Sequence, residues 1–510
     1  MYEPSPTRPE TGFRTDGCRA LLAALALACL GAAGPDARPH VLILLADDLG
    51  WRDVGYHGAP IETPQIDRLA REGVELDRFY VQPVCTPTRA ALLTGRAPVR
   101  AGLGYGVVRP WDYFGLPPGE TLLSEVFAGA GYQTAVVGKW HLGHSHRRYT
   151  PNQRGFEHFY GHLLGAIDYW SHSRFGGLDW QRNGSTLREP GYSTKLVGRE
   201  AARVIRERDR ERPLFLYVPF NAPHSPMQAP PELVERYAEL PDQEHLAAHA
   251  AFIESVALRL GLPVEQAAGI LDPPGEQPRA VFAAMVHALD AAIGEVLAAL
   301  DAAGMSENTL VVFASDNGGH IALGASNLPL RGEKSTVFEG GIRVPAAMRW
   351  PAGLDGGRRV SQTLSAMDVF PTLLAATGVE AQSGLPLDGA DRWAQIRGAA
   401  PVPAAETFFA VDGVQGVQQA LRSGRWKLIR NLGFARSQPP SLLLFDVESD
   451  PGESMDRSAS HPEVVEALLP RLEDWAGLNP PGAEQVAHWP HPGWIPPADY
   501  NAAVRGDASP

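Results

Sequence analysis

The chain has 510 residues and a formal net charge of −13, with 58 acidic against 45 basic side chains. The length allows a large domain plus a smaller one, and the acidic balance argues against nucleic acid as a general partner. An anionic substrate stays compatible with this charge, because a local cluster of Lys, Arg and His can form a positive pocket on an acidic protein.

Residues 1–37 are predicted to be a leader. Arg14 and Arg19 precede an almost unbroken apolar run over residues 20–33. This pattern is typical of a secretory signal peptide, and the run is too short for a stable membrane span. We therefore expect an exported protein, periplasmic or secreted. Ala28-Cys29 also resembles a lipoprotein cleavage site, so lipoprotein processing is an alternative. After cleavage Cys85 would be the one remaining cysteine, which excludes an internal disulfide.

The apolar run at residues 40–46 predicts a buried parallel strand. It ends in Asp47 and Asp48. Adjacent carboxylates at the end of a strand repel each other, and their simplest joint role is to hold a hard cation. The strand end is therefore a candidate metal site.

The segment Cys85-Thr86-Pro87-Thr88-Arg89 predicts the start of a helix, because a Pro stands just before a run of helix-forming residues. Cys85 would then lie beside the helix N-terminus, where free N–H groups and the helix dipole favour negative charge. Arg89 lies about one turn further on and can reach back to the same place. The sequence thus predicts a modifiable thiol in a position that attracts anions.

A strand is predicted at residues 134–137, and Lys139 and His141 follow it. They would point the same way if the extended backbone continues, and a cation beside an imidazole suits oxyanion stabilisation and proton transfer. A further buried strand at residues 213–220 leads to His224. The long segment over residues 149–194 is rich in aromatic residues, His, Gly and Arg, and we expect it to form loops around a substrate.

A fourth apolar strand at residues 309–314 ends in Ser315-Asp316-Asn317, and Lys334 follows in the sequence Leu-Arg-Gly-Glu-Lys. In open α/β sheets, ligands bind outside the carboxyl ends of the strands. Four oxygen-bearing side chains would converge there, a donor set that suits Ca²⁺ or Mg²⁺ and not Zn²⁺; they are Asp47, Asp48, Asp316 and Asn317. Helices are predicted at 63–73, 122–129, 195–212 and 280–303.

Two motifs carry a resemblance to a known family. Cys-x-Pro-x-Arg followed by Leu-Leu-Thr-Gly-Arg, and Gly-Lys-Trp-His at residues 138–141, resemble the signatures of the formylglycine-dependent sulfatases of the alkaline-phosphatase-like superfamily. The segments 82–87, 137–143, 161–164 and 329–332 look most like the arylsulfatase B (N-acetylgalactosamine-4-sulfatase) group.

The resemblance implies the fold class α/β, with a large mixed, mostly parallel sheet flanked by helices and a smaller C-terminal subdomain of an antiparallel sheet plus a helix. The expected catalytic domain covers residues 38–395, with an insertion at about 240–280. The expected C-terminal subdomain covers 396–510, with strand 426–429, helix 462–475 and an irregular Pro-rich tail.

The resemblance also implies the chemistry. A maturation enzyme oxidises Cys85 to formylglycine, whose hydrate attacks the sulfur of a sulfate ester, an aryl sulfate or a sulfated sugar. The implied catalytic residues are Cys85, Arg89, Lys139, His141, His224 and Lys334. The implied metal ligands are Asp47, Asp48, Cys85, Asp316 and Asn317, with Ca²⁺ expected and Mg²⁺ as the alternative.

Within this mechanism, the resemblance gives His141 the proton of the second hydroxyl of the hydrate, so that the aldehyde re-forms and sulfate leaves. His224 or Lys334 would protonate the leaving alcohol, and the sequence does not choose between them.

Two other functions are compatible with the sequence. One is a phosphonate or phosphodiester monoester hydrolase of the same superfamily; such enzymes carry a different pair where this chain has Lys139 and His141, and a His where it has Asn317. The other is a non-catalytic binder of sulfated glycans that keeps the fold without maturation. Comparing the hydrolysis rates of an aryl sulfate and an aryl phosphonate monoester tests the first alternative. The second would be identified by glycan binding that survives Cys85→Ala when the unsubstituted protein shows no turnover.

Overall fold

The structure is a computed structural model that describes residues 1–2, 38–268, 277–381, 384–413, 416–433, 440–481, 483 and 490–506. The chain divides into two units, Met1–Arg38 and Pro39–Pro510. Most of the first unit, with the predicted leader, lies outside the described residues. The second unit contains every element described below.

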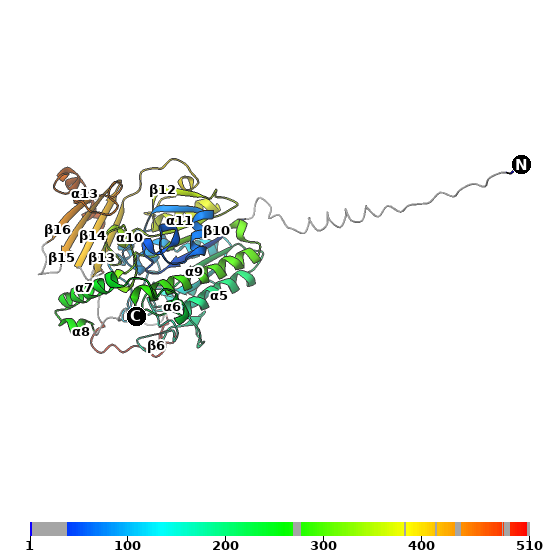
Figure 1. The fold of residues 1–510 in the computed structure, drawn as a ribbon, viewed down its shortest axis with the longest axis horizontal. Coiled ribbons are helices and arrows are strands. Elements are labelled where there is room, and N and C mark those ends of the chain that lie inside the picture. Colours follow the sequence, from blue (N-terminus) through cyan, green and yellow to red (C-terminus); the bar gives the residue numbers. More distant parts are fainter. Residues whose placement is uncertain are drawn as a thin grey trace. The chain divides into compact units, whose positions relative to one another are not determined.

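A ten-stranded mixed sheet forms the centre of the second unit (Figure 1). In order across the sheet, the strands are β12 (Arg358–Ser365), β2 (Val74–Tyr80), β11 (Ala346–Arg349), β10 (Thr309–Ser315), β1 (His40–Ala46), β9 (Leu214–Pro219), β3 (Gln133–Lys139), β4 (His158–His162), β7 (Gln181–Arg182) and β8 (Ser185–Thr186).

The four predicted apolar strands are adjacent in this sheet and parallel. β10, β1, β9, β3 and then β4 pair in parallel register, while β11 and β7 pair antiparallel with their neighbours. β1, β9 and β10 are buried along nearly their whole length, as expected of strands covered on both faces. The carboxyl ends of the four predicted strands therefore meet at one edge, which confirms the predicted convergence.

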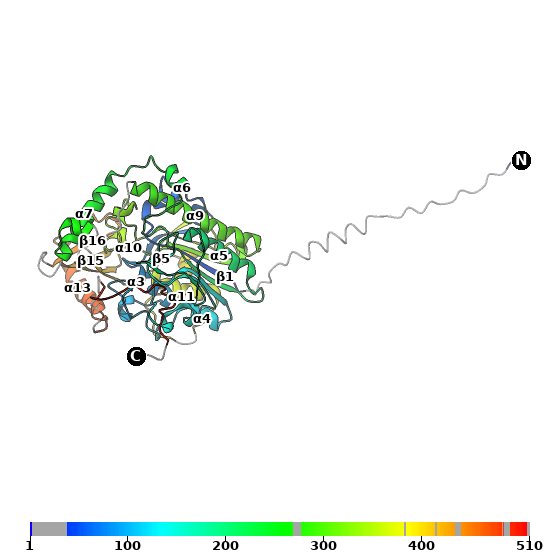
Figure 2. The same cartoon turned by 90° about the horizontal axis from the view of Figure 1, so that it is seen from below.

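Helices cover both faces of the sheet. Figure 2 shows α5 (Ser193–Glu207), α6 (Pro231–Arg236) and α9 (Pro278–Ala302) on one side, and α3 (Cys85–Thr94), α4 (Leu123–Gly129) and α11 (Ala366–Thr377) on the other. Two large apolar cores correspond to these two faces. α2 (Pro64–Glu72) joins the α9 side and α12 (Trp393–Ile396) the α11 side.

α9 is long and apolar enough to cross a membrane by composition, with a mean hydropathy of 1.6 over its most apolar window. However, 67% of that window is buried within this unit. Met285, Leu289, Ile293 and Leu297 are completely or almost completely buried, as their spacing predicts for a core-facing stripe. We therefore interpret α9 as a core helix.

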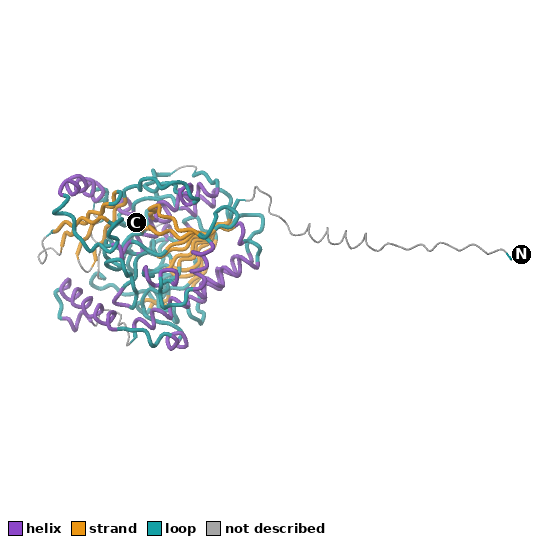
Figure 3. The backbone as a smooth tube through the Cα atoms, turned by 45° about the horizontal axis from the view of Figure 1, so that its top comes forward, coloured by secondary structure: helices purple, strands orange, loops and turns teal. Residues whose placement is uncertain are grey.

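A separate four-stranded antiparallel sheet follows, as Figure 3 shows. Its strands are β13 (Thr407–Gly413), β14 (Gly416–Ser423), β15 (Trp426–Gly433) and β16 (Ser441–Asp446), and α13 (Pro462–Ala476) packs against it. Together with the central sheet, this confirms the predicted fold class. The boundary at residue 395 stays a prediction.

The predicted insertion contains α7 (Gln243–Leu260) and α8 (Val264–Ala268). Its Pro-Pro-Gly break at residues 273–275 lies outside the described residues. His245 Nδ1 lies 2.9 Å from the carbonyl oxygen of Ile321, which ties α7 to the loop after β10.

Three sequence-based expectations were wrong in detail. The helix predicted at 195–212 ends at Glu207. The segment 149–194 is not all loop, since it contributes β4, β7 and β8, and also β5 (Ser173–Arg174) and β6 (Gly177–Leu178). In β4 (His-Phe-Tyr-Gly-His), His and Gly interrupt the apolar pattern that identifies a buried strand.

The third error concerns the backbone after β3. It does not stay extended, because His141 has a φ of 61°. The remaining short elements are α10 (Glu339–Ile342) and 3₁₀ turns at Trp51–Asp53, Gly55–His57, Pro98–Ala101, Arg147–Tyr149, Pro151–Gln153, Ser306–Asn308 and Ile321–Leu323.

Candidate active site

The two carboxylates after β1 are buried at the carboxyl edge of the sheet. Asp47 is 0% and Asp48 2% exposed. Asp48 has a φ of 68°, in the left-handed region that Asp tolerates better than most residues. The chain thus turns sharply straight after the strand. Both side chains lie beside the segments that carry the other predicted site residues.

Cys85 is the first residue of α3, so the predicted position at a helix N-terminus is confirmed. Its Sγ lies 3.5 Å from Asp47 Oδ1. In formylglycine an aldehyde oxygen would take the place of this Sγ. Burial and the nearby Asp316 raise the pKa of the Cys85 thiol well above its usual value, although Lys139 and Lys334 act in the opposite direction.

Arg89 lies one turn along α3 and is completely buried. Its Nε and Nη2 donate to Asp316 Oδ2 at 3.0 and 2.8 Å, and its Nη1 donates to the Lys139 carbonyl at 2.9 Å. Nη2 also lies 3.8 Å from Asp47 Oδ2. The side chain therefore ties α3 to the ends of β1, β3 and β10, and fixes the relative positions of two carboxylates.

The two lysine side chains of the predicted site each form an ion pair with one of the adjacent carboxylates. Lys139 Nζ lies 2.5 Å from Asp47 Oδ2, and both groups are fully buried. Lys334 Nζ lies 2.7 Å from Asp48 Oδ2 and is partly exposed. Burial lowers and Asp48 raises the pKa of Lys334, and the net direction is upward.

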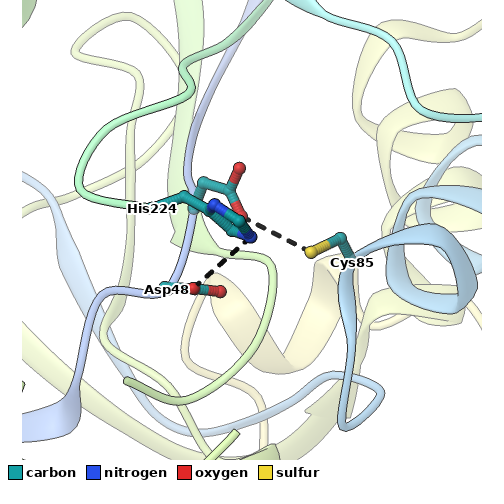
Figure 4. Close-up of side chains that lie close together, drawn as sticks. Asp48, Cys85 and His224 are labelled. Atoms are coloured by element: carbon teal, nitrogen blue, oxygen red, sulfur yellow. Dashed lines mark hydrogen bonds and ion pairs between the residues drawn. The ribbon is translucent and has the colours of Figure 1, made fainter. Parts of the chain in front are cut away.

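His224 lies on the same carboxylate as Lys334. Its Nε2 is 3.8 Å from Asp48 Oδ2, and its Nδ1 is 2.6 Å from the Ser225 carbonyl. Figure 4 shows Asp48, Cys85 and His224 converging from three different segments of the chain. Ligand atoms of Asp47, Asp48, Cys85 and His224 lie within 4.8 Å of one another, so the structure adds His224 to the residues that could hold a cation.

The ring of His141 is positioned by a hydrogen bond to a backbone carbonyl, because the chain at His141 is no longer an extended strand. Its Nε2 lies 3.0 Å from the Val108 carbonyl, so Nε2 carries the proton and donates. Burial, with help from Lys139 and Arg89, lowers the pKa of His141 well below its usual value, so the ring is neutral. Within the described residues, the buried Nδ1 has no hydrogen-bond partner. A neutral imidazole with a free Nδ1 lone pair is an acceptor for a proton.

Asp316 and Asn317 complete the oxygen-rich cluster. Asp316 Oδ1 accepts the Asp48 N–H at 3.4 Å, and Asn317 Nδ2 donates to Asp48 Oδ1 at 2.7 Å. The buried Asn317 Oδ1 has no hydrogen-bond partner among the described residues. An orphaned amide oxygen beside three carboxylates is the kind of donor that a hard cation satisfies.

Electrostatics give a second sign that the cluster fits a cation. Burial and the neighbouring Asp316 raise the pKa of Asp47 to about 7, even with Lys139 in contact. Burial is the larger cause and repulsion from Asp316 adds to it, whereas Lys334 and His224 hold the pKa of the neighbouring Asp48 below its usual range despite burial. The residues present fit a divalent cation held by oxygen atoms.

A cavity opens above this cluster. Cys85, His141, His224 and Lys334 line it, whereas the other six predicted residues lie buried beneath. The predicted set is thus brought together in two layers. The lower layer consists of Asp47, Asp48, Arg89, Lys139, Asp316 and Asn317.

Several functional contributors were not found from the sequence. Thr86, the residue after Cys85, donates its Oγ1–H to the His141 carbonyl at 2.9 Å and accepts the Val108 N–H at 3.1 Å. It therefore links the start of α3 to both His141 and Val108. Gly165 lies against His141, because a Cβ there would come within 2.3 Å of the ring. A lone Thr, Val or Gly carries no sequence signal for such contacts.

Comparisons with known proteins agree with this geometry. A family model described as Sulfatase matches residues 39–379. The chain is 32% identical to mouse arylsulfatase J, over 87% of this chain and 77% of the relative, and 30% identical to dog N-acetylgalactosamine-6-sulfatase, over 96% of both.

Two solved structures are also informative. Ps i-CgsB, solved in complex with k-i-k-neocarrahexaose, is similar with a TM-score of 0.74 and 30% identity, covering 87% of this chain and 94% of that one. The phosphonate monoester hydrolase of Agrobacterium radiobacter has a TM-score of 0.61 and 22% identity, covering 87% and 96%. At that identity, the second likeness shows the fold alone.

The mixed sheet flanked by helices places the chain in the α/β class, and the carboxylates, cationic side chains and histidines at its carboxyl edge form a site suited to an anionic substrate. Within this class, the chain belongs to the sulfatase family. It is a sulfuric ester hydrolase, as its arylsulfatase and steryl-sulfatase relatives are named. The narrower resemblance to the arylsulfatase B group stays a prediction.

Proposed function

We propose that this sulfatase is exported and hydrolyses the sulfate ester of a sulfated glycan or an aryl sulfate. Its nucleophile is formylglycine made from Cys85 by a maturation enzyme, and a divalent cation, Ca²⁺ or Mg²⁺, assists. The observation that carries the proposal is the position of Cys85, at a helix N-terminus in one cavity with His141, His224 and Lys334. The Ps i-CgsB complex supports a glycan as substrate.

When present, the modified residue supplies a hydroxyl nucleophile, and the cation supplies positive charge for that oxygen and for the sulfuryl group. Asp47, Asp48, Asp316 and Asn317 would hold the cation. Position 85 also belongs to the predicted ligand set.

The remaining steps belong to the residues around the cavity. Lys334 borders it directly and places positive charge where the sulfuryl oxygens must lie, and Lys139 adds charge from below. His224 and Lys334 are the two groups placed to protonate the leaving oxygen. His141 Nδ1 accepts a proton from the group at position 85, because its Nε2–H is held by Val108.

The mass of the peptide that carries position 85 tests this proposal. We expect formylglycine at residue 85 in protein purified from its native host, and hydrolysis of an aryl sulfate by that protein. Unmodified Cys85 in natively produced protein would contradict the proposal. Faster hydrolysis of an aryl phosphonate monoester than of the matched aryl sulfate would point to the phosphonate hydrolase alternative.

Cation binding should stabilise the folded protein. A ligand that binds the native state alone adds about 2.7 kcal/mol to the free energy of unfolding at 100 times its Kd. We expect Ca²⁺ or Mg²⁺ to raise the Tm of chelator-treated protein, and Asn317→Ala to reduce this rise because it removes the orphaned Oδ1. Asn431→Ala, at a partly exposed position of β15 in the second sheet, is the matched control and should keep the full rise. A Tm that neither cation changes would refute the metal site.

A further inference from the structure

A second cavity adjoins the catalytic one, and its function is not explained by the chemistry at Cys85. Pro110 lines both cavities, so they are neighbours along one segment. The second cavity is lined by aromatic residues from two distant parts of the chain, residues 111–113 and the C-terminal segment 491–505.

The aromatic rings form a compact group. Trp111 and Trp494 meet edge to face with their centroids 5.6 Å apart, and Phe175 lies 5.9 Å from Trp494 and 6.3 Å from Trp111. Phe175, which contacts Trp111 and Trp494 beside the cavity, is 50% exposed, and Tyr113, which lines the cavity, is 52% exposed. Large aromatic side chains that stay exposed around a cavity mark a binding surface.

Guanidinium groups accompany these rings. Arg505 lies over Tyr113 and Arg174 over Phe175, each 4.7 Å from the ring centroid, and Arg109 lies 5.9 Å from the centroid of Trp111. Arg109 and Arg174 also line the catalytic cavity, whereas Arg505 lines the second one. The carboxylate of Asp112 lines the second cavity too and accepts the Arg109 N–H at 2.7 Å. The combination of flat apolar faces and Arg side chains favours an occupant that is both ring-shaped and anionic.

The C-terminal segment is fixed against the catalytic unit by backbone hydrogen bonds. Tyr500 N–H donates to the Leu178 carbonyl at 2.9 Å, Leu178 N–H to Ala498 at 3.0 Å, and Arg505 N–H to Ser145 at 3.0 Å. Trp494 lies four residues before the first of these anchored positions, Ala498. A binding wall held in this way is organised before the ligand arrives.

We propose that the second cavity is a saccharide subsite that binds the sugar next to the sulfated residue in an oligosaccharide substrate. This inference rests on the proposed sulfate-ester hydrolysis and specifies its substrate as a sulfated glycan of several residues. The apolar C–H face of a pyranose ring packs against the partly exposed Trp494, which the nearly buried Trp111 supports from behind. The guanidinium groups of Arg109, Arg174 and Arg505 receive further sulfate or carboxylate groups. Because the two cavities share Pro110, one glycan chain occupies both.

The test compares long and short substrates in the Trp494→Ala variant. Protein with formylglycine at position 85 is assayed for sulfate release from 4-nitrophenyl sulfate and from hexasaccharides of carrageenan, chondroitin sulfate, heparin and fucoidan, with the sulfated disaccharide of each series alongside. We expect hydrolysis of at least one hexasaccharide. Trp494→Ala should lower kcat/KM for it by about tenfold through a higher KM, and leave kcat/KM for 4-nitrophenyl sulfate within about twofold.

Trp393→Ala is the matched control, because Trp393 is also a partly buried Trp but packs on Trp350 and lines neither cavity. It should change neither substrate's kcat/KM. Equal kcat/KM values of Trp494→Ala and wild type on the hydrolysed hexasaccharide would overturn the subsite. Hydrolysis of 4-nitrophenyl sulfate without any hexasaccharide would also overturn it, while leaving the proposed function intact. Formylglycine-containing protein that hydrolyses no sulfate ester would refute the proposed function itself.

Discussion

The Cys85→Ser variant is expected to react once with a sulfate ester and then stop. A Ser hydroxyl at the first residue of α3 occupies the place of the Cys85 Sγ, close to Asp47 and in one cavity with His141, His224 and Lys334. Its oxygen attacks sulfur, the bond from sulfur to the leaving oxygen breaks, and the alcohol departs with a proton. The product is a Ser sulfate ester without a second hydroxyl for His141 to deprotonate, so steady turnover falls by roughly three orders of magnitude or more.

Intact-protein and peptide mass spectrometry measure this outcome. The peptide that carries residue 85 should gain the mass of one SO₃ group after incubation with an aryl sulfate, and the aryl alcohol should appear as a burst of about one equivalent. Cys85→Ala is the paired control, since it lacks a nucleophile and should show neither burst nor mass gain. Continued turnover by Cys85→Ser, with Ser verified at position 85, would contradict a mechanism that needs two hydroxyls.

Most of the candidate site could be predicted from the sequence because its residues follow strands. Asp47, Asp48, Asp316 and Asn317 come directly after β1 and β10, which are recognisable as unbroken apolar runs. Parallel neighbours bring their carboxyl ends to one edge. Convergence of these side chains follows from topology alone, without knowledge of any side-chain conformation.

The sequence could not predict how the side chains are arranged at the carboxyl edge of the central sheet. Periodicity predicted that Lys139 and His141 point together, but the positive φ of His141 separates them, placing Lys139 beneath the cavity and His141 on its wall. The tautomer of His141 depends on the carbonyl of Val108, which any residue type would provide. Contacts made by backbone atoms leave no trace in the pattern of side chains.

Long-range packing set a similar limit on the rest of the cavity. Val411 and Asp412 of β13 and Tyr105 line it, although Tyr105 and β13 lie some three hundred residues apart in the chain, joined by a hydrogen bond from Asp412 N–H to the Tyr105 carbonyl at 2.8 Å. The Pro-rich tail was predicted to be irregular, and its described residues contain neither helix nor strand. Its position beside Trp111 nevertheless depends on tertiary contacts that local sequence does not encode.

Replacement of Lys427 by Met is expected to cost about 3–5 kcal/mol of unfolding free energy, the range for removing one partner of a buried ion pair. Lys427 Nζ, on β15, lies 2.9 Å from Glu339 Oε1 and 2.7 Å from Glu453 Oε1, and all three side chains are 0% exposed. It also donates to the Val337 carbonyl at 3.1 Å. Without it, two carboxylates would share a buried site with no cation between them. Denaturant unfolding of wild type and variant measures the loss.

The pH dependence of this loss identifies its cause. Burial and the neighbouring Glu339 raise the pKa of Glu453 to about 7, although Lys427 acts against them. A carboxyl whose folded pKa is raised stabilises the fold most at low pH, and this stability is lost as pH rises through the folded value. Despite burial, Lys427 and Arg343 hold the pKa of Glu339 below its usual value, whereas the pKa of Glu453 is raised. Removal of Lys427 takes away a cation that lowers both pKa values, so both carboxyls become easier to protonate and Lys427→Met should be less destabilising at pH 5 than at pH 8.

Lys195→Met is the matched control, because Lys195 is exposed on α5 and its loss should change stability by no more than about 0.5 kcal/mol at either pH. An equal loss for Lys427→Met at pH 5 and pH 8 would show that packing, and not charge, is what Lys427 provides.

The ion-pair cluster of Lys427, Glu339 and Glu453 is also connected to the active site, since Val337 and Glu339 lie three and five residues after Lys334. If charge is the cause, Lys427→Met should also loosen the loop that brings Lys334 to Asp48. The KM for a sulfate ester should then rise even under conditions where the variant stays folded.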